Sequence, residues 1–378
     1  MIKEKRPMAK PLYFKPRYIM IGGFLGAGKT TAILQFAQEL HRQGTRVGLI
    51  TNDQSFGLVD TALLSSQGLP VEEITGGCFC CRFQSLMDAA GKLTETAAPD
   101  IFIAEPVGSC TDLRAAVSYP LRRIYGDDYE IAPLSVLVDP IRAMRILGLD
   151  PGKAFSEKVL YVYDKQLEEA DIIVINKTDL LDSAKLEQLR SALAAKYPNA
   201  RIVAVSARTG DRVEAWHRQM LDGEMDVREA PEVDYEVYAD GEAMLGWLNA
   251  SARIDSDAPF DGNALLRRIA DRIQAIVRTG GGEIAHLKMT LSPDQGNDLG
   301  VVNLVRGDGT AESIHRLQDD MNSGELLVNL RAEADPEMLR EAVLGTLAGL
   351  GSSIDVKIEH SECFRPAKPA PTYRMATV

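Results

Sequence analysis

Short apolar runs alternate with amphipathic segments over the first half of the chain. Seven runs predict buried strands: YIMIGGF (18–24), VGLITND (47–53), PVEEI (70–74), DIFIAE (100–105), LSVLVD (134–139), DIIVINK (171–177) and RIVAVSA (201–207). Residues 31–41 predict a helix, because Ile33, Phe36, Ala37 and Leu40 recur at helical spacing. Continuous apolar strands separated by helices are typical of a parallel sheet covered on both faces. We therefore expect a doubly wound α/β domain over residues 18–223.

The pattern changes after residue 223. The acidic stretch EMDVREAPEVDYEVY (224–238) predicts a linker. The elements beyond it read β-α-β-β-(α)-β-α-β, where the bracketed helix is a polar stretch between GVVNLV and LLVNLRAE. This order predicts a smaller α+β domain over residues 239–365, of the kind seen in ferredoxin-like folds. Residues 1–17 are expected to be an N-terminal extension, and the Pro-rich residues 366–378 an extended tail.

Composition narrows the class of protein. The chain has 378 residues, 45% of them apolar, and a formal net charge of −12, which argues against a nucleic-acid binder held by general electrostatics. No segment has the pattern of a signal peptide, and no apolar run approaches the length of a membrane span. We expect a cytoplasmic protein, whose five cysteines are then free thiols, metal ligands or redox groups.

The segment GFLGAGKT (23–30) fits the phosphate-loop pattern and lies between a predicted strand and a predicted helix. Gly23, Gly26 and Gly28 would let backbone N–H groups approach phosphate oxygens. Lys29 would bind the β- and γ-phosphates, and the Thr30 hydroxyl would bind Mg²⁺. We also place the neighbours Ala27 and Thr31 at the nucleotide. A plain glycine-rich turn is the alternative, which the strand, lysine and helix make unattractive.

A second motif indicates which base is bound. NKTD (176–179) closes a predicted strand, and the Asp179 carboxylate could accept hydrogen bonds from the ring N–H and amine of guanine. Asn176 would contact the other edge of the purine, and the stem of Lys177 would pack over it. Ser206 and Ala207 in VSARTG would complete the base site. The alternative is a helix cap after a strand. Following a phosphate loop, the motif predicts GTP or GDP as ligand.

The segment DIFIAEPVG supplies a third group of candidates. Glu105, at the end of a predicted strand, would hold Mg²⁺ directly or through water. Gly108 would place a backbone amide near the γ-phosphate. Asn52, Asp53 and Asp60 are candidates for a switch segment, although each one alone is equally well explained as a turn or cap residue.

The cluster GGCFCC (76–81) brings Cys78, Cys80 and Cys81 together at the start of a predicted helix. The helix dipole and Arg82 should favour thiolates there. Such thiolates suit Zn²⁺ or another transition metal, although a closed tetrahedral site needs four ligands. Redox chemistry and plain packing remain alternatives. Cys110, His360 and Cys363 could add a ligand, but burial as small apolar side chains is the simpler explanation of both cysteines.

The motifs GFLGAGKTT, GGCFCC, AEPVG and NKTD, in this order, resemble those of the CobW-type P-loop GTPases, which are related to UreG and HypB. The resemblance implies slow GTP hydrolysis coupled to delivery of a metal or metallocofactor to a client enzyme. It implies phosphate and Mg²⁺ roles for Lys29, Thr30 and Glu105. The family's metal-contacting Glu is either replaced by Asp53 or displaced, and we count Asp53 with these three as a candidate for hydrolysis.

The sequence leaves the oligomeric state and two alternative functions open. A homodimer formed through the nucleotide face is plausible for a domain of this type. One alternative function is a GTP-gated module that remodels a cobalamin- or metal-dependent enzyme and carries no metal itself. Another is a small-molecule kinase, against which NKTD argues, because kinases seldom need a guanine reader.

Overall fold

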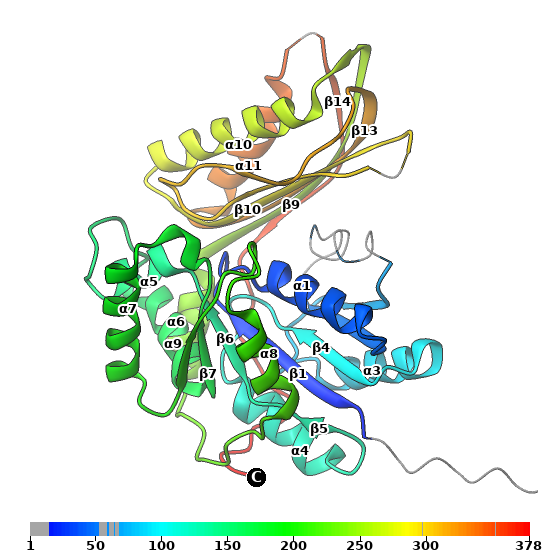
Figure 1. Cartoon of the computed structure of the whole chain (residues 1–378). Coiled ribbons are helices and arrows are strands. Elements are labelled where there is room, and N and C mark those ends of the chain that lie inside the picture. Colours follow the sequence, from blue (N-terminus) through cyan, green and yellow to red (C-terminus); the bar gives the residue numbers. More distant parts are fainter. Residues whose placement is uncertain (1–14, 53–58, 60–63, 65–67, 297, 352) are drawn as a thin grey trace, which may run out of the picture.

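The structure is a computed structural model, and it describes residues 15–52, 59, 64, 68–296, 298–351 and 353–378. It contains two sheets, one in each half of the chain (Figure 1). The predicted switch residues Asp53 and Asp60 lie outside the described residues. Within the described part of the chain, no helix is long and apolar enough to cross a membrane.

The first sheet is parallel throughout. Its strand order in the described residues is β3-β2-β4-β1-β6-β7-β8, with the short β5 also paired to β1. The strands are β1 (Arg17–Gly23), β2 (Val47–Asn52), β3 (Val71–Ile74), β4 (Ile101–Glu105), β5 (Glu130–Ile131), β6 (Ser135–Val138), β7 (Ile172–Ile175) and β8 (Arg201–Ala204). The predicted doubly wound α/β fold is confirmed, because the order reverses on either side of β1.

Helices cover both faces of this sheet (Figure 1). The helical segments are α1 (Lys29–Arg42), α3 (Phe83–Ala97), η1 (Arg114–Ser118), α4 (Tyr119–Tyr125), α5 (Pro140–Ile146), α6 (Glu157–Glu169), η2 (Thr178–Leu180), α7 (Ser183–Lys196), α8 (Val213–Asp222) and α9 (Tyr235–Ala243). Helices α1 and α8 pack on one face around Phe36 and Trp216. Helices α3, α6 and α7 pack on the other, around Phe83, Val159 and Leu189. Because parallel strands end at one edge, the residues after β1, β4 and β7 gather there, as ligand sites in such sheets do.

The second sheet is antiparallel, with the order β12-β11-β10-β13-β9-β14 in the described residues. Its elements are β9 (Leu245–Phe260), α10 (Gly262–Thr279), β10 (Glu283–Pro293), β11 (Gly300–Leu304), β12 (Glu312–His315), β13 (Met321–Glu333), α11 (Pro336–Ala348) and β14 (Asp355–Phe364). The strands β14-β9-β13-β10, with α10 and α11, have the β-α-β-β-α-β connectivity of a ferredoxin-like domain, as the sequence predicts.

One predicted element of this domain is wrong. The polar stretch before β13 was expected to be helical, but it contains β12, which pairs with β11 at the edge of the sheet. Glu312 and His315 are exposed there, so the strand lacks the apolar alternation of a half-buried strand. An edge strand of this kind is held by backbone pairing, which side-chain pattern does not reveal.

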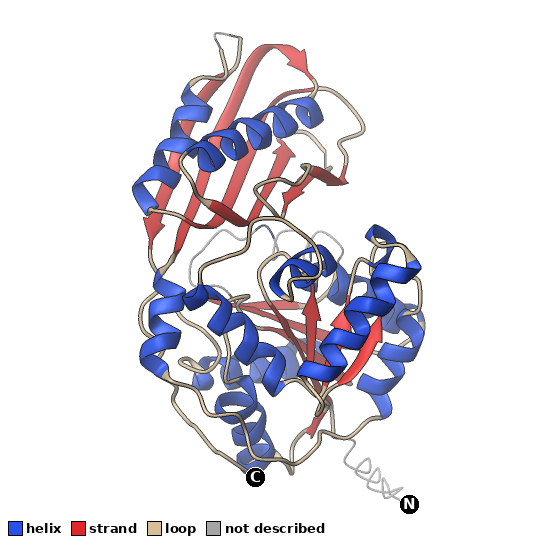
Figure 2. Cartoon of the chain, turned by 90° about the vertical axis from the view of Figure 1, so that its left-hand side faces the viewer, coloured by secondary structure: helices blue, strands red, loops and turns tan. Residues whose placement is uncertain are grey.

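The two faces of the second sheet have different chemistry. One face is apolar and packs under α10 and α11, with Leu248, Val328 and Leu330 in its core (Figure 2). The alternate residues of the same strands face the first domain, and they include Trp247, His286 and Asn329. Because successive side chains in a strand point to opposite faces, each strand serves both the core and the interface.

The chain crosses between the two domains twice. Residues 224–234 have no regular structure, and helix α9 begins inside the segment predicted as a linker. Helix α9 packs closely on α6, since a Cβ at Gly241 would collide with the Lys158 carbonyl oxygen. After β14 the tail leaves the second domain without regular structure and returns along the first, where the C-terminus lies (Figures 1 and 2).

Candidate nucleotide and metal site

The phosphate loop joins β1 to α1 and has the backbone that the motif requires. Gly28 precedes α1 in the left-handed region (φ 91°), and a Cβ there would lie 2.5 Å from Asn176 Nδ2. The Lys29 ammonium donates to the Gly23 carbonyl oxygen at 2.9 Å, so it lies across the loop. The N-terminus of α1 then faces the same space, which favours an anion. This cradle fits the phosphates of a nucleotide.

A hydroxyl and a carboxylate meet at the inner end of the loop. Thr30 Oγ1 donates to Glu105 Oε1 at 3.0 Å, and both side chains are buried. Oxygen ligands of these two types are those that Mg²⁺ prefers beside nucleotide phosphates. The donor set therefore fits the ion that the sequence predicts for this position.

The predicted base-reading residues are brought together. Asn176 Nδ2 donates to the Ala27 carbonyl oxygen at 3.0 Å, and its Oδ1 accepts from the Ala207 N–H at 3.0 Å. Ser206 Oγ donates to Asp179 Oδ1 at 2.6 Å. The side chains of Asn176 and Asp179 thus connect the NKTD loop with the phosphate loop and with the loop at Ser206 and Ala207.

Lys177 lines the cavity and is held at its ammonium end by the phosphate loop and Asp139. Its ammonium donates to the Gly26 carbonyl oxygen at 2.7 Å and to Asp139 Oδ2 at 2.8 Å. Burial opposes ionisation of Asp139, but the charges of Lys177, Arg142 and Arg306 outweigh it and hold the pKa of Asp139 at about 2. Asp139 is therefore ionised, and it links the base-reading motif to the second domain through Arg306.

Both domains line the cavity beside the phosphate loop, which has a volume of about 570 Å³. The second domain contributes His286, Lys288, Asn303 and Arg306 to its wall. Burial, followed by the charge of Lys288, lowers the pKa of His286 well below its usual value. The sequence pattern did not indicate that these residues line the nucleotide cavity, because nothing local in β10 or β11 marks them as facing a phosphate loop.

One buried arginine connects the two domains at this cavity. The guanidinium of Arg142 donates to the carbonyl oxygens of Leu25 and Val305, and to that of Ala285 at 3.1 Å. It also lies over the Phe155 ring, 5.0 Å from the ring centroid. One side chain thus holds the phosphate loop, strand β10 and the residue that follows β11.

The three cysteines of GGCFCC form a compact cluster before α3. The Sγ atom of Cys78 lies 2.8 Å from the Sγ atom of Cys80 and 3.1 Å from the Sγ atom of Cys81. Among the described residues, these three are the one group of potential metal ligands whose donor atoms all lie within 4.8 Å of one another. Cys78 and Cys80 are buried and Cys81 is half-buried. The arrangement suits a soft or borderline metal ion.

Hydrogen bonds among the thiols shift the pKa values of the three cysteines in opposite directions. Hydrogen bonds from Cys110, Cys80 and Cys81 lower the pKa of Cys78 well below its usual range. The pKa of Cys80 is raised well above it, and the hydrogen bond with Cys78 raises the pKa of Cys81 to about 11. The guanidinium of Arg82, next to the cluster in sequence, donates to the Gly76 carbonyl oxygen. The pKa of Cys78 is thus shifted in the opposite direction to those of Cys80 and Cys81, because Cys78 accepts the hydrogen bonds of its neighbours.

Asn52, a candidate switch residue, holds the thiol loop in place. Its Nδ2 donates to the carbonyl oxygens of Ile74 (3.0 Å) and Gly77 (2.7 Å), and its Oδ1 accepts from the Phe79 N–H at 2.9 Å. Asn52 also lines the nucleotide cavity. The end of β2 therefore connects the cavity with the cysteines.

The C-terminal tail lies over the same cysteines. The Ala370 N–H donates to Cys81 Sγ at 3.2 Å, and the Thr372 N–H donates to the Cys80 carbonyl oxygen at 2.8 Å. The Tyr373 ring packs edge-on against Phe83, and Arg374 pairs with the buried Asp112 at 2.9 Å. The tail is extended, as predicted, but it is also anchored on both sides of the cluster.

The other candidate ligands separate into two groups. His360 and Cys363 lie on β14 of the second sheet, where Cys363 Sγ donates to the Pro336 carbonyl oxygen at 2.9 Å. They do not join the cluster. Cys110 lies against it, on the loop that follows β4.

Comparison with known proteins agrees with this site. Residues 17–204 match the nucleotide-binding domain of the CobW/HypB/UreG family. This domain belongs to the CobW/HypB/UreG family. The match includes the phosphate loop, the thiol loop, Glu105 and the NKTD motif.

Curated relatives of the CobW/HypB/UreG domain are named as zinc chaperones. The chain is 31% identical over 198 residues to "Zinc chaperone CobW" of Sinorhizobium sp, covering 47% of this chain and 55% of that protein. It is 32% identical over 166 residues to "Zinc chaperone YeiR" of Escherichia coli, covering 42% and 46%. The chain thus spans about half the length of the curated relatives it matches.

Two solved structures are similar to this chain. HypB from Helicobacter pylori in complex with nickel is 19% identical, with a TM-score of 0.41, covering 55% of this chain and 86% of that one. Zn(II)-bound YjiA GTPase from E. coli is 17% identical, with a TM-score of 0.36, covering 88% and 99%. Both scores are below 0.5, so the fold assignment rests on the sheet topology and the family match.

Proposed function

We propose that this chain binds GTP with Mg²⁺, hydrolyses GTP slowly, and uses the nucleotide state to control a zinc-like metal ion that it delivers to a client protein. The observation that carries the proposal is the position of the thiol loop, which Asn52 ties to the wall of the nucleotide cavity. The zinc chaperones among the relatives support the choice of metal.

Each part of the site has a role in this proposal. The Lys29 ammonium and the N–H groups of the phosphate loop would hold the phosphates, and Asp179 would select guanine. Thr30 and Glu105 would hold Mg²⁺, which neutralises phosphate charge when it is bound. Among the described side chains that line the cavity, His286 is the only histidine, and its lowered pKa makes it a weak general base. Turnover without a partner should therefore be slow.

Zinc affinity in different nucleotide states tests the proposal. We expect zinc Kd values measured with a non-hydrolysable GTP analogue, with GDP and without nucleotide to differ by about 10-fold, which corresponds to a coupling free energy of about 1.4 kcal/mol. The Cys78→Ser/Cys80→Ser/Cys81→Ser variant should lose the high-affinity site. Equal Kd values in all three states would contradict nucleotide control.

A second candidate function is a GTP-gated module that remodels a metal- or cobalamin-dependent enzyme without carrying metal. The burial of Cys78 and Cys80 in one apolar cluster with Phe79 and Phe83 favours it. Wild-type protein that binds no zinc after equilibrium dialysis, but that still hydrolyses GTP, would support this function. The prediction of a homodimer is untested, and in this structure the second sheet lies on the nucleotide face.

A further inference from the structure

A row of polar side chains crosses the second sheet on the face toward the nucleotide cavity. Its members lie opposite one another on neighbouring strands: Asn249 on β9, Asn329 on β13, Lys288 on β10 and Asn303 on β11. Residues paired in this way point to the same face of a sheet. Lys288 and Asn303 line the cavity, and Asn329 Oδ1 accepts from the Val59 N–H of the first domain at 3.0 Å. Lys288 is therefore the charged group that this row presents to the cavity.

One edge of the second sheet contacts the base-reading end of the cavity. Arg208 pairs with Asp179 at 3.4 Å and with Glu312 of β12 at 3.3 Å. Arg306, two residues after β11, pairs with Asp139 of the first domain at 3.4 Å. Strand β12 and the end of β11 therefore lie where guanine would bind.

The next strands contact the opposite end of the cavity. Val59 and Val301 form a buried cluster against which Leu327 of β13 packs. Val59 follows β2, which lies with β4 on one side of β1, whereas β7 lies on the other side. The NKTD loop follows β7 and Glu105 ends β4, so a bound nucleotide would extend from its base toward β4 and β2. Val59 therefore marks the end at which the terminal phosphate would lie.

Lys288 lies on β10 between a contact with the phosphate loop and the contact with Val59. Three residues before Lys288, the Ala285 carbonyl oxygen would lie 2.9 Å from a Cβ at Gly26, so the strand touches the phosphate loop. Two residues after Lys288, the strand pairs with Val301, beside which Val59 packs. The half-buried Lys288 is therefore directed at the space between the phosphate loop and the segment after β2.

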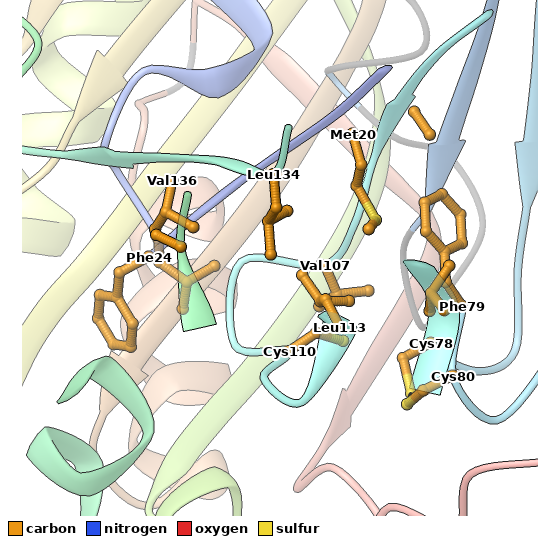
Figure 3. Packing of buried hydrophobic residues seen from close by; sticks show 14 of the residues in the cluster. Met20, Phe24, Cys78, Phe79, Cys80, Val107, Cys110, Leu113, Leu134 and Val136 are labelled. Atoms are coloured by element: carbon orange, nitrogen blue, oxygen red, sulfur yellow. The ribbon is translucent and has the colours of Figure 1, made fainter. Parts of the chain in front are cut away.

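Packing between the domains fixes this strand in place. Trp247 and Ala285 of the second domain belong to one buried apolar cluster with Phe24 and Val107 of the first, which are labelled in Figure 3. The Arg142 guanidinium adds hydrogen bonds to the phosphate loop and to β10. The second domain thus holds Lys288 on a rigid element, as a pre-organised binding site requires.

The cavity wall carries an excess of positive charge. Among the described residues that line it, five are basic and two are acidic: Lys29, Lys177, Arg208, Lys288 and Arg306 against Glu105 and Glu312. Lys177, Arg208 and Arg306 pair with carboxylates at the base-reading end. Lys29 and Lys288 come from opposite walls, one from each domain. This distribution of charge suits the phosphates of a nucleotide.

We infer that Lys288 binds the terminal phosphate of GTP, opposite Lys29, so that the second domain completes the GTPase site. This inference rests on the proposed function, because it assumes that GTP is the ligand. The ammonium would neutralise charge on the γ-phosphate oxygens, as a cationic side chain supplied in cis or by a partner does in other GTPases. The competing explanation is that Lys288 only stabilises the polar row and does not contact the nucleotide.

The nucleotide affinities of Lys288 variants test the inference on the full chain. We expect Lys288→Ala to weaken binding of a non-hydrolysable GTP analogue by about 10-fold or more, since a charge-assisted hydrogen bond is lost. The affinity for GDP should change by less than about 2-fold, because GDP lacks the phosphate that the lysine would hold. Lys288→Arg keeps the charge and should retain most of the affinity for the analogue. A merely structural role would affect both nucleotides alike.

Lys357→Ala is the matched control, since Lys357 is exposed on β14, at the far edge of the same sheet. It should leave both affinities unchanged. Equal losses for the analogue and GDP in Lys288→Ala, or no loss for either, would overturn the inference alone. Wild-type protein that binds neither nucleotide would overturn the proposed function instead.

A measurement on the wild type covers the case in which Lys288→Ala does not fold. Labelling of Lys288 by an amine-reactive reagent, read by mass spectrometry, should be slowed by the GTP analogue and much less by GDP. Labelling of Lys357 should be the same in both nucleotide states. Equal labelling of Lys288 with the analogue and with GDP would overturn the inference.

Discussion

The side-chain amide of Asn176 donates a hydrogen bond to the carbonyl oxygen of Ala27, 3.0 Å away, and so attaches the base-reading motif to the phosphate loop. Asn176→Ala leaves this buried carbonyl and the Ala207 N–H without their partner. An unpaired buried group costs about 1–3 kcal/mol. We expect a loss of at least about 10-fold in GTP affinity, measured by displacement of a fluorescent nucleotide. The exposed Asn199→Ala is the control, and equal losses in both variants would contradict the role of Asn176.

Asp179→Asn should change which base is preferred. The carboxylate is an acceptor for the N–H groups of guanine, whereas an amide can donate to the second carbonyl oxygen of xanthine. We expect GTP affinity to fall by about 100-fold, as polar sites reject ligands that leave groups unpaired. XTP should then bind more tightly than GTP in competition experiments. A variant that still prefers GTP would show that Asp179 only holds its neighbours Ser206 and Arg208 in place.

Arg142→Lys tests whether the domains are coupled through the nucleotide cavity. Lysine keeps the charge but cannot donate simultaneously to Leu25, Ala285 and Val305. We expect the free energy of unfolding to fall by about 2–4 kcal/mol, because buried carbonyls lose donors. Limited proteolysis should also separate the two domains faster. Arg190→Lys, on the exposed face of α7, should leave both measurements unchanged.

His217 makes stability depend on pH. It is buried on α8 and stacks on Phe36 of α1 at a ring distance of 4.2 Å, and burial lowers its pKa to about 4 from 6.5. The unfolded chain therefore binds a proton that the folded chain does not, and stability is lost as pH falls from 6.5 to 4. The loss is at most about 3 kcal/mol. In His217→Leu, urea unfolding should show a smaller loss over this range, whereas the exposed His41→Leu should behave as wild type.

Removal of the tail should expose the thiol cluster. Residues 370–376 donate to Cys80 and Cys81 and hold Tyr373 against Phe83. We expect a chain ending at Pro369 to release zinc to a colorimetric chelator several-fold faster, while its GTP affinity stays the same. Removal of Thr377 and Val378 alone is the control. Equal release rates in all three proteins would show that the tail does not limit access.

The sequence predicted those parts of the site that short motifs encode. The phosphate loop, Asn176, Asp179 and the three cysteines each lie within a few residues of their partners in a motif, so their types and spacing are informative. The edge strand β12 was missed, because Glu312 and His315 lack a strand pattern. Asn52 appeared only as a switch candidate, whereas its bonds to Gly77 and Phe79 depend on how β2 and β3 pair.

Long-range packing explains the other omissions. His286 and Lys288 enter the nucleotide cavity because one face of the second sheet meets the first domain. Ala370 reaches Cys81 across 289 positions of sequence. Neither relationship follows from local pattern, since it depends on the relative placement of two domains and a tail.

The segment from Glu105 to Cys110 runs from the phosphate loop to the cysteine cluster. Glu105 begins it beside Thr30, Gly108 packs against Leu25, and Gln166 holds the stretch that ends at Cys110. This short segment connects the two sites directly, without a chain of intermediate residues through the protein interior. Because thermodynamic linkage is reciprocal, a metal ion that binds more tightly in one nucleotide state would raise the affinity for that nucleotide by the same factor. The delivered metal would then also regulate nucleotide binding by this domain.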